Sequence, residues 1–553
     1  MLKIINIILF CFIVPTVMLI EPIKEIIKNK NIKGIWKDYK WHFILYLIFV
    51  VGSLVRLVGI DKMPNALNVD EASTGYEAYS LMKYGIDRRG NSYPVYLYAW
   101  GSGQSVLYSY LSIPAIAIFG LSEYSIRLPM AIIGIISLYA FYFLLKNGSD
   151  NKKIPIIGAA FFAICPWHIM KSRWGLECNL FPDLVLIGLS IFYYGIKEKK
   201  NIFQVIGIII IALSGYSYST SYVFLPIFVI GLLIYLVVKK EISIKKAILY
   251  FLIVFIVCIP IMLYVIINMF DLEQFKILNI TIPKLKHNRY TEATIIGEGS
   301  NIIENIFINL YYFVYMIVFQ GDSIYWNSLP IYGMIYIPSV LFFTIGLLKS
   351  LVGKEYKNKL LSKIMNIWML ASIVLAAISF VNVNRMNIVV IPCVYYAVIG
   401  LYESLKKDKA ISVIITLIYI ALFGFFLKEY NSIDFDKEIW FTSNFKQVYE
   451  YCEEQNVSKI YCLRRFSEPY IYFLFYGQKD VHEYIDTVEL FDEKEYFNNV
   501  KSFSKYYFYG PEKIERNSIM IMTLKDNIPE ERIDGDYNIE EKVIGNFKIY
   551  TIR

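Results

Sequence analysis

Cysteine is scarce in this sequence, and several motifs that mark common enzyme classes are missing. Seven cysteines are spread over 553 residues, and none stands in a metal-ligand spacing. No glycine-rich loop that could cradle a phosphate and no nucleophile elbow occurs. Four cysteines lie in apolar stretches, where we expect packing roles. Cys452 and Cys462 could form a disulfide, although two cysteines without a wider pattern are a weak signal.

Charged residues are also few, at 18% of the chain, against 57% hydrophobic and 17% aromatic residues. The mean hydropathy of +0.48 lies outside the range of ordinary soluble domains. A membrane-crossing helix needs about 20 mostly apolar residues, because its backbone groups must pair within the segment. We expect an all-α polytopic membrane protein of about eleven or twelve transmembrane helices, from the apolar windows 1–20, 41–60, 125–145, 154–170, 180–196, 202–219, 222–238, 247–268, 331–348, 364–380, 388–402 and 411–427.

The lysines explain the formal net charge of +8. They gather in short stretches between the apolar windows, at 24–40, 146–153, 197–200, 239–246, 349–363 and 406–409. The positive-inside rule places such loops in the cytoplasm, and the alternate loops then face outward. The excess charge therefore sets the topology, and nucleic acid is not expected as a partner.

The same topology decides the position of two further apolar stretches, 106–119 and 302–319. If either crossed the membrane, the next lysine-rich loop would fall outside, so we expect both to be interfacial helices on the outer side. The first outer loop then covers residues 61–124, and a long outer loop covers residues 269–330.

The apolar windows and the lysine-rich loops divide the chain into three regions. Residues 1–40 hold a helix, expected to be retained because no small-residue cleavage site follows it, and a cytoplasmic linker. Residues 41–427 form the transmembrane region. Residues 428–553 lack long apolar runs and fall outside, and their alternating patterns predict a small extracytoplasmic α/β domain with a helix at 445–454 and strands at 459–463, 518–523 and 547–552.

Asp70 and Glu71 stand side by side just after the apolar window 41–60. A plain structural interpretation is that Asp70 caps a helix starting near Ala72. An ionised aspartate can also act as a general base or bind a cation. Adjacent side chains on a helix point in different directions, so only one of the two acids should face a reacting centre. The two interpretations are compatible, since a capping position also fixes a carboxylate.

A second polar cluster is CPWHIMKSRWGLECN, at the outer end of one span. Arg173 and Glu177 are four residues apart and would share one face of a helical turn, as an ordinary ion pair or as a binding site. An arginine there suits a phosphate or pyrophosphate. His168 could also reach a phosphate, although a histidine at a helix end is more often simply hydrogen-bonded.

Two more outer segments carry polar groups. NVNRMN places Arg385 in a very short loop, where its plain role would be to reach lipid headgroups. The long outer loop ends in GDSIYWNSLP, which contains Trp326, and loops of such length are usually functional or disordered. Carboxylates and arginines beside a membrane surface suit a substrate with a lipid tail, an interfacial phosphate and a polar head.

The order of NVDEASTGYEAYSLMKYG, LYSYLSIPAIAIFGLSEYSIRLPMAIIG and PWHIMKSRWGLECN resembles the GT-C glycosyltransferases of the glycosyltransferase family 39 type, such as protein O-mannosyltransferases and bacterial aminoarabinose transferases. The resemblance covers roughly residues 41–427 and leaves the tail unmatched. It implies transfer of a sugar from a polyprenyl-phosphate carrier to an acceptor outside the membrane.

The resemblance also assigns roles to residues. It implies Asp70 as general base with Glu71 as its companion, Arg127 in the RLP element, Arg173 and Glu177 in donor or acceptor binding, and Arg385 as a phosphate contact. Many bacterial relatives carry a Lys-Pro-Pro element before the LYSY part, and Gln104 stands in that place here without a charge. The carrier phosphate must then meet an arginine elsewhere. Tyr76, Trp100 and Trp326 are further candidates for holding the acceptor.

The sequence therefore predicts an inverting membrane glycosyltransferase in a bacterial-type cell membrane, with its site on the outer side. Its partners would be a polyprenyl-phosphate sugar donor, membrane lipid, and an acceptor that is a protein, a cell-wall polymer or a lipid. The sequence indicates no particular cofactor and leaves the metal open: a divalent cation could bind near the two acids, which alone are too few ligands. The alternative is a lipid-linked saccharide flippase or transporter without transferase chemistry.

Overall fold

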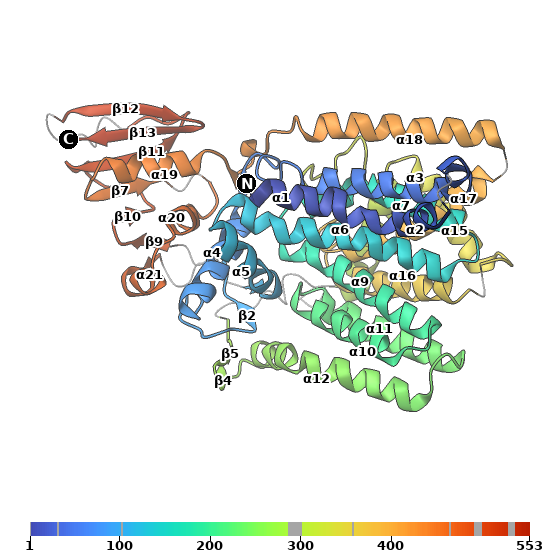
Figure 1. Cartoon of the computed structure of the whole chain (residues 1–553). Helices are drawn as coiled ribbons and strands as arrows, with labels where there is room; N and C mark the ends of the chain where they lie inside the picture. The colour runs from blue at the N-terminus through green and yellow to red at the C-terminus, as the bar shows by residue number, and fades with distance from the viewer. Residues whose placement is uncertain are drawn as a thin grey trace. The chain divides into compact units, whose positions relative to one another are not determined.

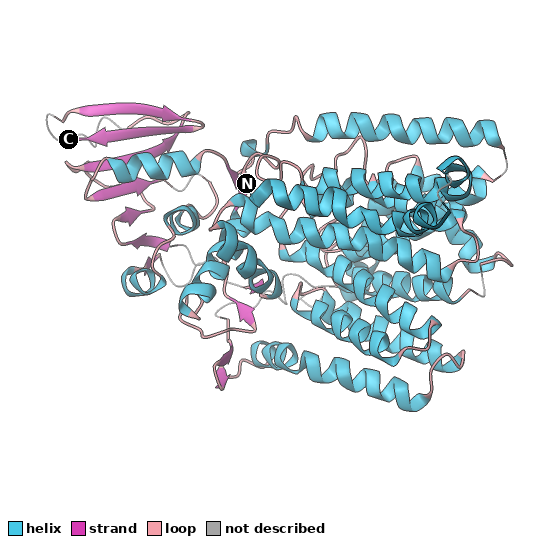
Figure 2. Cartoon of the chain, in the orientation of Figure 1, coloured by secondary structure: helices cyan, strands magenta, loops and turns pink. Residues whose placement is uncertain are grey.

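The computed structural model describes residues 2–29, 32–100, 103–285, 301–356, 359–406, 408–463, 466–491, 500–528 and 537–553. Residues 286–300 of the long outer loop lie outside this description, as do residues 30–31, 357–358 and 407 of the lysine-rich stretches. The described chain is mainly helical, with strands concentrated toward its C-terminal end (Figure 2). It divides into two compact units, each made of three separate stretches of sequence.

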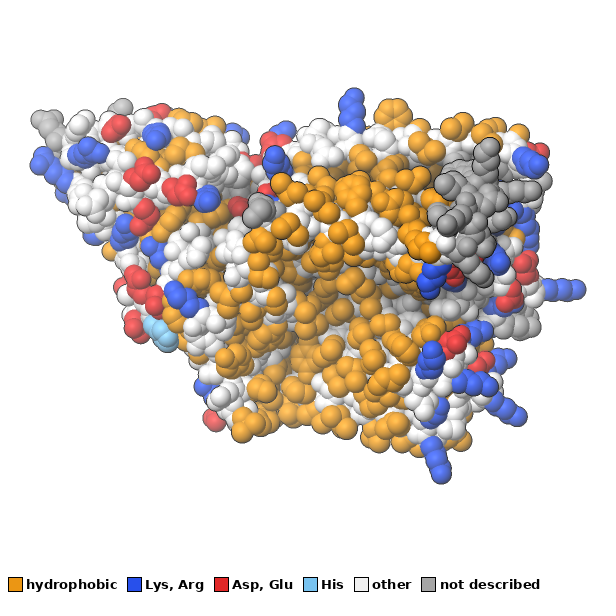
Figure 3. Space-filling model, in the orientation of Figure 1, with side chains coloured by type: hydrophobic (Ala, Val, Ile, Leu, Met, Phe, Trp, Pro, Cys, Tyr) orange, Lys and Arg blue, Asp and Glu red, His pale blue; other side chains and the backbone are white. Residues whose placement is uncertain are grey.

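Ten helices in the described part of the chain are long and apolar enough to cross a membrane. They are Leu2–Glu25, Tyr39–Leu57, Glu123–Gly148, Glu177–Lys197, Ser221–Val238, Ile244–Met269, Ile302–Phe319, Leu360–Ile378, Asn387–Leu405 and Lys409–Tyr430. Figure 3 shows hydrophobic side chains gathered over these helices, with lysine and arginine side chains collected at one end of them. The multi-pass membrane architecture predicted from the sequence is confirmed.

Three predicted spans differ from the observed helices. The window 154–170 is bent by 57° between α7 (Lys153–Ala163) and α8 (Pro166–Ser172). Cys165 is extended there, as the residue before a proline prefers. The windows 202–219 and 331–348 contain shorter helices, α10 (Asn201–Leu213) and α15 (Ser339–Val352).

The helix α14 (Ile302–Phe319) covers the second of the two stretches expected to be interfacial. The sequence placed it at the interface, yet it is long and apolar enough to span, and it lies against α16 (Leu360–Ile378). Length and apolar composition are shared by spanning and interfacial helices, so the interfacial position of α14 stays a prediction.

Unit 1 consists of Met1–Ile60, Met130–Pro260 and Arg289–Ser432 and holds most of the helices (Figure 1). Besides those already given, it contains α1 (Leu2–Ile8), α2 (Ile20–Asn29), α3 (Ile32–Leu57), most of α6 (Glu123–Gly148), α9 (Glu177–Lys197), α11 (Ser221–Val238), most of α12 (Ile244–Met269), α17 (Val390–Leu405) and α18 (Lys409–Tyr430).

Unit 2 consists of Asp61–Pro129, Ile261–Asn288 and Ile433–Arg553. Its helices are α4 (Val69–Tyr84), α5 (Leu107–Phe119), α19 (Phe445–Glu454), α20 (Tyr470–Gly477) and α21 (Val481–Thr487). Small antiparallel pairs join β1 (Leu67–Asn68) to β6 (Phe441–Thr442), β2 (Tyr96–Leu97) to β3 (Gln104–Ser105), and β4 (Phe275–Ile277) to β5 (Ile280–Ile282). The first outer loop and the C-terminal region therefore fold as one body.

A larger mixed sheet forms the end of unit 2. In the described residues its strand order is β12-β13-β11-β7-β10-β9-β8. The strands are β7 (Lys459–Cys462), β8 (Glu489–Leu490), β9 (Val500–Phe503), β10 (Tyr506–Tyr507), β11 (Ser518–Thr523), β12 (Ile539–Ile544) and β13 (Phe547–Ile552). The predicted helix and three strands of the α/β region are confirmed as α19, β7, β11 and β13. Cys452 and Cys462 are buried free thiols, so the disulfide considered from the sequence is not formed.

Candidate functional site

The first turn of α4 places Asp70 and Glu71. The N-cap is Asn68, whose side-chain oxygen accepts from the backbone N–H of Asp70 at 2.9 Å. The Glu71 carboxylate reaches back to the Asn68 N–H at 3.1 Å and completes a capping box. The helix therefore starts at Val69, and Asn68 has the capping role that the sequence analysis considered for Asp70.

Glu71 is fully buried and forms an ion pair with Arg127. Arg127 donates through Nε to Glu71 Oε1 and through Nη2 to Oε2, both at 2.8 Å. It also donates to the carbonyls of Pro64 and Ala66, again at 2.8 Å. Arg127 is buried as well, so its side chain is not accessible to a phosphate. Its hydrogen bonds connect α6 to α4 and to the loop before α4.

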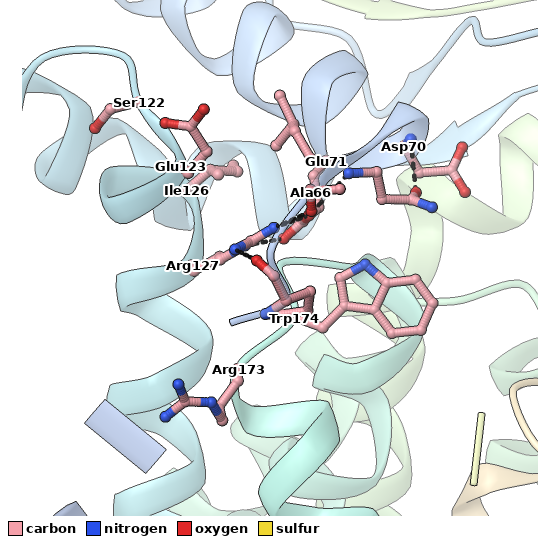
Figure 4. A network of polar contacts seen from close by, with 12 residues as sticks. Ala66, Asp70, Glu71, Ser122, Glu123, Ile126, Arg127, Arg173 and Trp174 are labelled. Carbon is pink, nitrogen blue, oxygen red and sulfur yellow. Dashed lines mark hydrogen bonds and ion pairs between the residues drawn. The ribbon is translucent and has the colours of Figure 1, made fainter. Parts of the chain in front are cut away.

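Asp70 has a different environment. Its side chain is half-buried, and its Oδ1 accepts a hydrogen bond from Trp100 Nε1 at 2.7 Å. Figure 4 shows the Glu71 carboxylate directed toward Arg127 and the Asp70 carboxylate directed away from it. The prediction that the two acids point in different directions is confirmed, and Asp70 is the more accessible of the two.

Trp100 rests on a buried ion pair that the sequence analysis did not single out. The Arg88 guanidinium lies 5.3 Å from the Trp100 ring centre, and its Nε lies 3.0 Å from Glu77 Oε1. Burial raises the pKa of Glu77 to about 7, against the opposing charge of Arg88. Tyr470 packs edge-on to Trp100 with a ring distance of 6.2 Å. The sequence offered one indication of this ion pair, namely that Glu77 and Arg88 are opposite charges in the polar stretch that follows Asp70.

Gln104 and Tyr76 are both buried in unit 2. The Gln104 amide donates to Thr74 Oγ1 at 2.8 Å and to the Asp70 carbonyl at 3.4 Å. The Tyr76 hydroxyl donates to the Lys479 carbonyl at 3.0 Å. These side chains brace α4, and as buried groups they offer no open surface to a phosphate or an acceptor.

The second cluster lies in unit 1. Arg173 is buried and donates to the carbonyls of Val55, Val58 and Gly59 at 2.8–3.0 Å, where α3 ends. Residues 173–176 are not helical, so Arg173 and Glu177 do not share the helical turn considered from the sequence. Glu177, half-buried, begins α9. The arginine satisfies the open carbonyls of a helix end.

His168 joins two buried charges within the same unit. Its Nδ1 accepts from Arg56 Nε at 3.0 Å, and its Nε2 lies 3.1 Å from Asp183 Oδ1. All three side chains are buried. Arg56 donates to Nδ1, so the neutral Nε2–H tautomer can bridge the arginine to the aspartate. Arg56 also donates to the carbonyls of Phe162 and Ala163, which the bend after α7 leaves open. His168 is thus committed to holding that bend.

Lys171 connects three segments of unit 1 that were predicted to lie on the outer side. Its ammonium donates to Asn384 Oδ1 at 2.8 Å, to Asn327 Oδ1 at 3.4 Å and to the Trp326 carbonyl at 3.5 Å. It also lies 4.5 Å from the centre of the Trp174 ring. The sequence predicts these segments on one side of the membrane, but Lys171 was not among the predicted site residues, although it stands three residues before Trp174, close enough for a cation–π contact.

Arg385 follows Asn384 and is half-buried. Its backbone N–H donates to Asn382 Oδ1 at 2.8 Å. Asp322 braces the same loop, since its Oδ2 accepts from the Val383 N–H at 2.9 Å. Trp326 is half-buried, with its ring 5.2 Å from that of Tyr325. Arg385 and Trp326 are the predicted site residues of unit 1 that combine partial exposure with a braced loop.

A divalent cation does not fit the acidic pair. Both Glu71 oxygens are engaged by Arg127, so the pair offers a metal the Asp70 carboxylate at most. Hard divalent cations take several oxygen ligands. Over the described ranges, no group of three or more His, Cys, Asp or Glu side chains lies close enough to hold a metal ion.

Solved structures decide the fold. No family model and no curated protein matches the chain. The apo oligosaccharyltransferase of Archaeoglobus fulgidus aligns with TM-score 0.52 and 13% identity over 80% of this chain. ArnT from Cupriavidus metallidurans, bound to undecaprenyl phosphate, aligns with TM-score 0.52 and 11% identity over 78% of this chain and 84% of its own. The chain has the GT-C fold.

A further GT-C structure is similar at the same level. AglB from Archaeoglobus fulgidus, in complex with an inhibitory peptide and a dolichol-phosphate, aligns with TM-score 0.50 and 13% identity over 78% of this chain. The chain spans 63–64% of the length of these archaeal structures. The GT-C fold that the resemblance implied is therefore confirmed.

Proposed function

We propose that this protein is a membrane glycosyltransferase that moves a sugar from a polyprenyl-phosphate carrier to an acceptor, with Asp70 as general base. The observation that carries the proposal is the contrast between the two adjacent acids. Glu71 is buried and neutralised by Arg127, whereas Asp70 is half-buried and accepts a hydrogen bond from the Trp100 indole N–H. A partly exposed, oriented carboxylate at a helix start can accept a proton.

The reaction is a single displacement. Asp70 takes the proton of the acceptor hydroxyl while that oxygen forms a bond to the anomeric carbon. The bond from this carbon to the carrier phosphate breaks, and the leaving polyprenyl phosphate takes the electron pair. The configuration of the anomeric carbon is inverted. The Arg385 guanidinium supplies positive charge to the leaving phosphate, a form of stabilisation that grows as the bond breaks.

The donor class has support from similar folds. The ArnT structure contains undecaprenyl phosphate, and the AglB structure contains a dolichol-phosphate. Under the proposal, Trp326 and Glu177, both half-buried, contact the sugar or the acceptor, which is a protein, a cell-wall polymer or a lipid. Under the proposal, Asp70 and the C-terminal region lie on the outer side of a bacterial-type membrane, an orientation that the lysine distribution supports through the positive-inside rule.

The test is Asp70→Asn in the purified full-length protein, supplied with polyprenyl-phosphate sugars in vesicles. Loss of a general base should lower turnover by roughly 10²- to 10⁴-fold. Asp271→Asn is a matched control. This exposed aspartate forms an ion pair with Lys284 at 2.9 Å, and the two residues flank the β4–β5 hairpin. Near-normal turnover by Asp70→Asn would overturn the base assignment. Movement of intact donor across the vesicle without glycosylated product would instead indicate a flippase.

A further inference from the structure

The start of α4 is held by a segment far away in sequence. In the β1–β6 pair, Leu67 lies opposite Thr442 and Asn68 opposite Phe441. The Val69 N–H and the Asn68 side-chain amide both donate to the Trp440 carbonyl, at 3.0 and 3.1 Å. The backbone immediately before Asp70 is therefore one edge of a two-stranded ladder whose other edge belongs to the C-terminal region.

The same region supports the body of α4 through α20. The Tyr472 hydroxyl donates to the Leu67 carbonyl at 3.3 Å, and the Lys479 carbonyl accepts from Tyr76. A Cβ atom at Gly75 would lie 2.6 Å from the Phe475 ring, so the absence of a side chain there lets the two helices approach closely. Both helices are almost entirely buried along this contact.

A third connection reaches the Asp70 carboxylate itself. Tyr470, the first residue of α20, lies against Trp100 and also 5.8 Å from the Arg88 guanidinium. Trp100 is thus held between Tyr470 and Arg88 while it donates to Asp70. Trp100 adopts a positive φ of 50°, which is uncommon for a bulky residue and needs surrounding contacts to persist.

We propose that residues 433–553 are the scaffold that positions Asp70, with Tyr470 as a positioning residue that acts through Trp100. This inference rests on the proposed function for its catalytic meaning. The C-terminal region sets the backbone of the helix start through β6 and sets the carboxylate orientation through the Tyr470–Trp100 contact. Displacing a catalytic group by about 1 Å can cost a hundredfold in rate.

The variant Tyr470→Leu removes the ring that supports Trp100, and Tyr470→Phe keeps it. No described residue hydrogen-bonds to the Tyr470 hydroxyl, so Tyr470→Phe should behave as wild type. Hydrogen–deuterium exchange of the full-length protein in nanodiscs then reports on residues 67–75 without any substrate. We expect exchange there to be about tenfold faster in Tyr470→Leu and unchanged in Tyr470→Phe. Equal exchange in all three proteins would overturn the scaffold.

Activity provides the second measurement. In Tyr470→Leu, Trp100 should no longer hold its N–H against the Asp70 carboxylate. The charged carboxylate then loses a hydrogen bond, so the acidic limb of the plot of kcat against pH should move to higher pH. Other charged or titratable groups packed nearby are Glu71 with Arg127, Arg88 with Glu77, and Tyr472. We expect Tyr470→Leu to lower kcat at least tenfold and to shift this limb, with KM for the donor unchanged.

The two measurements separate the inference from the proposed function. If Asp70→Asn keeps its activity while Tyr470→Leu speeds exchange, the scaffold stands and the base assignment fails. If Asp70→Asn is inactive while Tyr470→Leu matches wild type in exchange and in its pH profile, the scaffold fails and the base assignment stands. Should Tyr470→Leu not fold, Trp100→Phe tests the same link, and an unchanged pH profile in that variant would overturn the inference.

Discussion

The buried pair of Glu71 and Arg127 predicts a large and asymmetric effect on stability. Arg127→Met removes two bonds to Glu71 and two to the carbonyls of Pro64 and Ala66. It leaves a fully buried carboxylate without its cation, which typically costs about 3–5 kcal/mol. In the double variant Glu71→Gln with Arg127→Met the unpaired charge is gone, and the remaining cost comes from two open carbonyls at about 1–3 kcal/mol each.

The assay is denaturant unfolding of the full-length protein in mixed micelles, for both single variants and the double variant. We expect Arg127→Met to be less stable than the double variant, although it carries one substitution fewer. Thermodynamic coupling between the two sites should then be visible in the double-mutant cycle. Additive effects, or an Arg127→Met variant as stable as wild type, would refute the interpretation that Glu71 is a structural acid.

Two further predictions concern Arg385 and Glu77. Arg385→Ala should raise KM for a polyprenyl-phosphate sugar by roughly 10- to 150-fold, since a hydrogen bond to a charged group contributes about 1.5–3 kcal/mol. Lys276→Ala, at an exposed cation, serves as control, and equal KM values would remove Arg385 from the phosphate site. Glu77 has a pKa raised by burial from 4.5 to about 7, so the folded protein holds this proton more tightly than the unfolded one. Stability should therefore fall as pH rises from about 4.5 to about 7, and Glu77→Gln should flatten that slope in unfolding measured against pH. An unchanged slope in Glu77→Gln would contradict the burial effect.

The sequence predicted the helices and strands whose residue pattern lies within one continuous segment. Apolar windows of membrane length and the alternating patterns of the tail have physical causes that a single segment carries. The different directions of Asp70 and Glu71 also follow from helix geometry alone. These predictions needed no knowledge of which segments meet.

The remaining features depend on partners distant in sequence. Arg173 was considered for phosphate binding because its neighbours in sequence suggested it, whereas the carbonyls it satisfies belong to the end of α3. Lys171 donates hydrogen bonds to Asn327 and Asn384, and no pattern in the sequence near Lys171 predicts these distant partners. The pairing of β1 with β6 could not be predicted from the sequence either, because a two-residue strand is too short to show an alternating pattern.

The pairing of β1 with β6 also has a consequence for biosynthesis. Asn68 and its acceptor Trp440 are separated by 372 positions, so at a typical rate of translation the partner emerges roughly 20–75 s later. During that interval the nascent chain already contains Asp70 but lacks the strand that orders the helix start. The segment that holds the start of α4 is therefore synthesised long after α4 itself, and a chain truncated before residue 440 should insert its helices without acquiring an ordered Asp70.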